Sequence, residues 1–75
     1  MKKEEIDQII SSNTGRRRPL PEDFSMFSYP EWDSLAYMAI LAELESISKK
    51  KITPMEALKL QSLEGIYKLF LDSNE

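Results

Sequence analysis

Apolar residues recur at helical spacing in four segments of the chain, beginning near the N-terminus. Ile6, Ile9 and Ile10 lie on one side of a helical turn and predict a short amphipathic helix over residues 3–12. Gly15 follows this segment, and a glycine at that place favours the left-handed conformation that ends many helices.

The longest periodic segment predicts the main helix, over residues 34–48. Asp33 or Ser34 can cap its N-terminus, because both side chains accept hydrogen bonds from the first free N–H groups of a helix. Its buried face should consist of the apolar residues spaced at i, i+3, i+4 and i+7, which are Tyr37, Ile40, Leu41, Leu44 and Ile47.

Residues 16–33 contain three prolines and predict a long loop between these two helices. We expect the loop to pack across the helices and bury its aromatic rings, which belong to Phe24, Phe27, Tyr29 and Trp32.

The C-terminal part of the chain predicts two short helices. Thr53 and Glu56 form a capping box around Pro54, which indicates a helix over residues 54–59. Ser62 can cap another helix, whose apolar stripe is Leu63, Ile66, Tyr67 and Phe70. One helix from 54 to 72 is the alternative, but Gln61 and Ser62 favour a break.

No strand pattern or internal repeat is present, so we expect an all-α fold in a single domain of residues 1–75. The predicted architecture is a small four-helix bundle, with three principal helices, one short helix and a long first loop. A chain of this size buries only about 60% of its unfolded surface, which leaves little material for a deep cleft.

The first half of the main helix is apolar on every side. Leu35 lies about 160° from the centre of the predicted buried stripe, and Met38, Ala39 and Ala42 fall on its flank or back. One interpretation is an exposed apolar patch beside Ser34, ready for a partner protein. The other is that Leu35 lies under the 16–33 loop and that the alanines are simply good helix formers.

Composition excludes several classes of site. The chain has no cysteine and no histidine, so it can form no disulfide, thiol nucleophile or Cys/His metal site. No apolar run approaches the ~20 residues of a membrane span. We therefore expect a cytoplasmic protein with no membrane span and no bound metal.

Charge is unevenly distributed along the chain. Residues 19–48 hold six acidic and no basic side chains, and this acidic stretch lies between the basic clusters 16–18 and 49–51. The simplest interpretation of each cluster is a solvated loop. A sequence pI near 4.9 argues against nucleic acid as a partner.

Ser34 admits two interpretations. It can be an ordinary helix cap, or its hydroxyl can be the acceptor of a covalent group such as a phosphate, which the N-terminus of a helix favours. Without a histidine to activate it, Ser34 is a poor nucleophile by itself. Any modification would therefore be made by another enzyme.

The sequence resembles the acyl carrier protein family. The motif is Asp33-Ser34-Leu35 at the start of the second helix, and the similarity runs without a gap from about residue 30 to residue 71. Further matching residues are Trp32, Leu44, Glu45, Ile52, Ala57, Leu60, Ser62 and Leu63.

The resemblance implies a carrier, not an enzyme. A phosphopantetheinyl transferase would attach 4′-phosphopantetheine from coenzyme A to the Ser34 hydroxyl, with Asp33 helping to hold the transferase's metal ion. The thiol of the arm would then carry an acyl or aminoacyl group as a thioester. The implied partners are this transferase, an acyl- or aminoacyl-loading enzyme, and downstream synthases or transferases that meet a monomeric carrier.

The resemblance also implies two groups of contact residues. Partner enzymes would contact Leu35, Met38, Ala42, Glu31 and Glu43. A carried chain could fold into a pocket between the second and third helices, lined by Leu44, Ile52, Ala57 and Leu60.

The sequence departs from typical fatty-acid carriers in its charges. Only Glu43 and Glu45 place acids on the second helix, and the basic clusters 16–18 and 49–51 are unusual for the family. We therefore expect a specialised biosynthetic pathway rather than bulk fatty-acid synthesis. The alternative function is an unmodified helical protein-interaction module that uses the face of Leu35 and Met38. A small enzyme is the weakest reading, because nothing resembles an acid/base or metal constellation.

Overall fold

The computed structural model describes residues 1–71, which form four helices and no strand. The helices are α1 (Lys3–Thr14), α2 (Ser34–Ser48), α3 (Pro54–Lys59) and α4 (Leu63–Phe70). The all-α bundle predicted from the sequence is confirmed.

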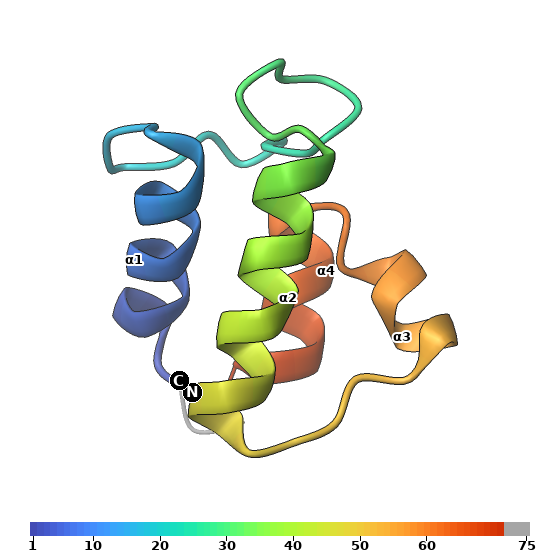
Figure 1. The fold of residues 1–75 in the computed structure, drawn as a ribbon. Coiled ribbons are helices and arrows are strands. Elements are labelled where there is room, and N and C mark those ends of the chain that lie inside the picture. The colour runs from blue at the N-terminus through green and yellow to red at the C-terminus, as the bar shows by residue number, and fades with distance from the viewer. Residues whose placement is uncertain (72–75) are drawn as a thin grey trace.

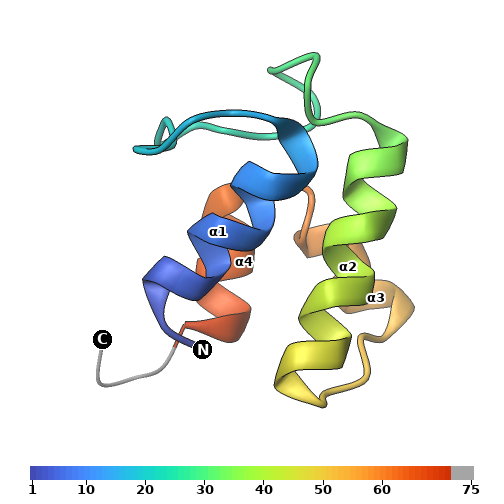
Figure 2. The same ribbon diagram turned by 60° about the vertical axis from the view of Figure 1, so that its left-hand side comes forward.

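The three longer helices lie side by side, and α1 contacts both α2 and α4 (Figures 1 and 2). The long loop between α1 and α2 crosses one end of the bundle, and the short α3 lies at its side. This arrangement places the start of α2 at the end of the bundle that the loop covers.

Local sequence signals explain where each helix begins and ends. Gly15 ends α1 with φ 76°, in the left-handed region that glycine adopts without strain. Thr53 and Glu56 form the predicted capping box of α3, and the Ser62 side chain accepts from the N–H of Gly65 at the start of α4. Helices α2 and α3 have the predicted bounds, and α1 continues two residues further than predicted.

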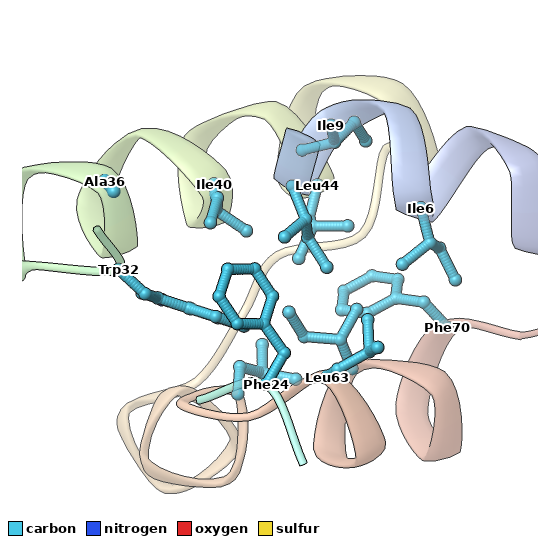
Figure 3. Close-up of a cluster of buried hydrophobic side chains, with 12 residues drawn as sticks. Ile6, Ile9, Phe24, Trp32, Ala36, Ile40, Leu44, Leu63 and Phe70 are labelled. Carbon is cyan, nitrogen blue, oxygen red and sulfur yellow. The ribbon is translucent and has the colours of Figure 1, made fainter. Parts of the chain in front are cut away.

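The hydrophobic core collects side chains from α1, α2 and α4, together with Leu60 after α3 and two aromatic residues of the loop (Figure 3). Phe24 and Trp32 are fully buried, and their rings meet edge to face at 5.2 Å between centroids. The other buried apolar residues are Ile6, Ile9, Ile10, Ala36, Ile40, Leu44, Leu60, Leu63, Ile66 and Phe70.

Main-chain hydrogen bonds attach the loop to the connection between α3 and α4. The N–H of Leu63 donates to the carbonyl of Phe24 at 2.8 Å, and the N–H of Met26 donates to the carbonyl of Gln61 at 3.1 Å. The loop is thus joined to the far side of the bundle before it reaches α2.

Two predicted buried residues are exposed. Ile47 is 49% exposed because the last turn of α2 extends past the ends of α1 and α4 (Figures 1 and 2). Phe27 is 78% exposed, since a tight turn closed by the Ser28 N–H and the Ser25 carbonyl directs the chain outward there. In α2 the fully or nearly fully buried residues are Ala36, Ile40 and Leu44.

A buried polar contact joins α1 to α4. The hydroxyl of Tyr67 donates to the carboxylate of Asp7, which is itself buried. Burial raises the pKa of Tyr67, and the hydrogen bond to Asp7 raises it further. Tyr67 is therefore a neutral donor over the whole physiological range of pH.

Gly65 of α4 lies close to the main chain at the end of α3. A Cβ added there would lie 1.8 Å from the carbonyl oxygen of Lys59, a main-chain atom that cannot move aside cheaply. We expect Gly65→Ala to lower the free energy of unfolding by about 1–3 kcal/mol, the usual effect of overpacking, even though alanine favours helices. Urea unfolding followed by circular dichroism measures this.

The matched control is Lys68→Ala, on an exposed position of the same helix. It should change the free energy of unfolding by no more than about 0.5 kcal/mol. Equal stability of the two variants would contradict the close approach of Gly65 to the carbonyl of Lys59.

Candidate functional site

Ser34 is the first residue of α2, and its side chain is exposed. Its hydroxyl has no hydrogen-bond partner among the described residues. The cap is Asp33 instead, whose carboxylate accepts from the N–H of Ala36 at 2.9 Å. The interpretation of Ser34 as the cap is therefore wrong, and its hydroxyl is available to a reagent from outside.

The start of α2 suits a phosphate group bound to Ser34. Asp33 occupies two of the first N–H groups, since its side chain accepts from Ala36 and its carbonyl accepts from Tyr37. The N–H groups of Ser34 and Leu35 precede them and have no partner within residues 1–71. Free N–H groups and the positive end of the helix dipole both favour an anion at this place.

An apolar stripe continues from Ser34 along the outer side of α2. Leu35 is 79% exposed, Met38 is 65% exposed and Ala42 is also exposed. These three residues are spaced at i, i+3 and i+7 and so lie on one side of the helix, which we call the Leu35–Met38 face. The idea that the loop covers Leu35 is wrong.

Trp32 fixes the end of the loop directly before this site. Its ring is fully buried against Phe24, and the main-chain N–H of Trp32 donates to the carbonyl of Tyr29 at 3.1 Å. The indole N–H has no acceptor among the described residues, so packing rather than hydrogen bonding holds the ring. Only Asp33 separates this anchored side chain from Ser34.

Glu31 is half-buried and paired rather than freely exposed. Its Oε2 accepts from Nη1 of Arg16 at 2.9 Å, and this hydrogen bond lowers the pKa of Glu31 below its usual value. The guanidinium of Arg16 also lies over the ring of Tyr29, 5.2 Å from its centroid. Arg16 is therefore not part of a freely solvated basic cluster, as its sequence neighbours Arg17 and Arg18 suggested.

Glu43, the second acid predicted to meet partners, lies on the side of α2 that faces α1. Its Oε1 accepts from Nδ2 of Asn13 at 3.2 Å. It is exposed, but it lies roughly 140° around the helix from Met38, at 100° per residue. The structure therefore groups Leu35, Met38 and Ala42 with Ser34, and it shows the Glu43 side chain bound by Asn13 of α1.

The residues predicted to line a pocket between α2 and α3 are all buried or half-buried. Leu44 and Leu60 have no exposed surface, and Ile52 and Ala57 are half-buried. The hydroxyl of Tyr37 crosses from α2 to donate to the carbonyl of Ala57 in α3. The predicted pocket stays a prediction.

Polar contacts also hold the segment that leads into α3. The N–H of Ile52 donates to Oε2 of Glu45 at 2.7 Å, and Nζ of Lys50 lies 3.5 Å from Oε2 of Glu56. A surface hollow of about 520 Å³ lies elsewhere, next to Lys59 and Gly65. None of the four residues predicted to line the acyl pocket belongs to the lining of this hollow.

No protein-family model, no curated protein and no solved structure matches this chain. The resemblance to acyl carrier proteins therefore stays a prediction from the sequence. Within residues 1–71, none of the helices combines the length and apolar character needed to cross a membrane.

The division of roles between Asp33 and Ser34 predicts different effects of their substitution. Asp33→Ala removes the cap of α2 and should lower the free energy of unfolding by about 0.5–2 kcal/mol. Ser34→Ala removes an unpaired, exposed hydroxyl and should change it by no more than about 0.5 kcal/mol. Thermal and urea unfolding of both variants measures this. A larger loss for Ser34→Ala than for Asp33→Ala would show that the serine is structural.

Proposed function

We propose that the chain is a carrier protein that holds acyl or aminoacyl intermediates as thioesters on a 4′-phosphopantetheine arm attached to Ser34. The observation that carries this proposal is the exposed, unpaired hydroxyl of Ser34 at the first position of α2. Because Asp33 caps α2, the hydroxyl of Ser34 is not used for capping. Ser34 also lies beside the exposed Leu35–Met38 face.

The chemistry requires a second protein. The Ser34 oxygen attacks the phosphorus next to the pantetheine half of coenzyme A and forms a phosphodiester. The pyrophosphate bond breaks, the nucleotide half leaves, and the hydroxyl proton passes to a base of the transferase, because this chain has no histidine to take it. The exposed carboxylate of Asp33 is suited to face the transferase's metal ion.

The chain itself would supply position and recognition. The amides of Ser34 and Leu35 stabilise the phosphate that results, and the Leu35–Met38 face offers apolar contact to partner enzymes. The tethered arm raises the effective concentration of its cargo at each partner. The paired state of Glu31 and the position of Glu43 support a specialised pathway rather than bulk fatty-acid synthesis, since few free acids remain near Ser34.

The second candidate is an unmodified interaction module that binds a partner through the same face. The exposed fractions of Leu35 and Met38 favour both functions equally. The two differ in whether Ser34 accepts a covalent group.

Covalent loading is tested by intact mass. We expect the purified chain, incubated with coenzyme A, magnesium and a broad-specificity phosphopantetheinyl transferase, to gain the mass of one phosphopantetheine group. Ser34→Ala should abolish the gain. Ser28→Ala and Ser46→Ala are the matched controls, because both serines are exposed and lie in the preceding loop and on α2. No gain with several transferases would favour the interaction module.

Recognition through the Leu35–Met38 face is tested by the rate of loading. Leu35→Ala and Met38→Ala should each leave the free energy of unfolding within about 0.5 kcal/mol of the wild type, since both side chains are largely exposed. Each should lower kcat/KM for loading by roughly tenfold, as expected for a truncated contact residue worth about 1–2 kcal/mol.

Ile47→Ala is the control, because Ile47 is also an exposed apolar residue of α2 but lies three turns from Ser34. It should be loaded at the wild-type rate. Strong destabilisation of Leu35→Ala would show that the residue belongs to the core.

A further inference from the structure

Arg16 connects two segments that are far apart along the loop. It follows Gly15 at the end of α1, and Glu31, its ion-pair partner, comes three residues before Ser34. The pair therefore closes most of the loop that leads from α1 to the candidate site.

The main chain of Arg16 is fixed to α1. Its carbonyl accepts from the hydroxyl of Ser11 at 2.6 Å, and its N–H donates to Oγ1 of Thr14 at 3.3 Å. The left-handed turn at Gly15 sets the direction in which the chain leaves the helix. The main chain of Arg16 is thus held in place before its guanidinium contacts the loop. Forming that contact therefore costs less conformational entropy than it would from a mobile main chain.

The side chain of Arg16 contacts three residues further along the loop. Nη1 donates to Glu31 at 2.9 Å, and the guanidinium carbon lies 5.2 Å from the ring centroid of Tyr29 and 5.9 Å from that of Phe24. The Tyr29 hydroxyl donates to Asp23 at 2.8 Å, which keeps the ring in place. These are the contacts that a planar, charged arginine makes better than a lysine.

The other two arginines of the cluster provide a comparison. Arg17 and Arg18 are exposed, whereas Arg16 is half-buried with part of its surface covered by the loop. One member of the basic cluster is therefore built into the structure, and its neighbour Arg17 carries the same charge without those contacts.

We infer that Arg16 is a positioning residue for the modification of Ser34: through Glu31 and Tyr29 it holds the loop end, and so presents Asp33 and Ser34 in the arrangement that the modifying enzyme binds. This inference rests on the proposed function. Without Arg16, Trp32 still anchors the chain, but the segment 25–31 samples more conformations and must be ordered when the enzyme binds.

The test compares loading kinetics of Arg16→Ala and Arg17→Ala, using the purified chain, coenzyme A and a broad-specificity transferase at constant ionic strength. We expect Arg16→Ala to raise KM for the carrier by roughly three- to tenfold with kcat unchanged, in line with the loss of a half-buried ion pair and a cation–π contact. Arg17→Ala should stay within about twofold of the wild type. Arg16→Lys should recover part of the loss, because lysine keeps the charge but not the planar fork.

Glu31→Gln provides a second variant that leaves the stacked guanidinium in place. It should also raise KM, as Arg16→Ala does, although the two substitutions change the net charge in opposite directions. Hydrogen exchange of the amides in 25–31 should quicken in both variants and not in Arg17→Ala, at temperatures where every variant is folded.

Three outcomes would overturn the inference. Equal KM values for Arg16→Ala and Arg17→Ala would show that the contacts of Arg16 have no part in loading or that charge alone attracts the enzyme. Opposite effects of Arg16→Ala and Glu31→Gln on KM would show that the charges of these two side chains interact with the enzyme directly, and not through the position of the loop. Failure of the wild type to be loaded would instead overturn the proposed function, and this inference with it.

Discussion

The burial of Trp32 is the constraint on which the rest of the candidate site depends. Its ring fills the core between the loop and α2, and three residues later Leu35 is almost fully exposed. This change from full burial to exposure within three residues requires a fixed backbone. The hydrogen bond from the Ala36 N–H to the Asp33 carboxylate helps to fix it. A buried tryptophan contributes several kcal/mol to stability, whereas each surrounding hydrogen bond contributes about 1 kcal/mol. Packing of Trp32 therefore contributes more to the position of α2 than any one of the hydrogen bonds around it.

The sequence predicted the helices well because their limits depend on local chemistry. The capping box of Thr53 and Glu56 involves residues three apart, and the left-handed turn at Gly15 depends on one residue. Exposure was harder to predict, because it depends on where neighbouring elements end. Ile47 fits the periodic stripe, yet it belongs to the last turn of α2, which extends past the ends of α1 and α4 (Figure 1). Phe27 has the composition of a core residue, but a tight turn directs it outward.

The candidate site shows the same division. Helical periodicity offered an exposed Leu35 as one of two interpretations, and capping preferences left the cap of α2 open between Asp33 and Ser34. The structure decides both points, since Leu35 is 79% exposed and Asp33 is the cap. The partner of Glu31 was not readable, because Arg16 lies fifteen residues away and meets it only after the loop has folded back on α1. Pairing across a loop is a property of the tertiary structure. A sequence rich in acids near a serine therefore does not reveal which of those acids are free.

The balance between charge and apolar contact at Ser34 follows from these pairings. Glu31 is paired with Arg16, Asp33 is engaged in capping, and Glu43 faces α1. An exposed ion pair with a partner contributes about 0–1 kcal/mol, while covering an exposed leucine or methionine contributes about 1.5–3 kcal/mol. Binding of a partner beside Ser34 would therefore draw most of its free energy from Leu35 and Met38. The acidic segment would act mainly over distance, by attracting basic partners before contact.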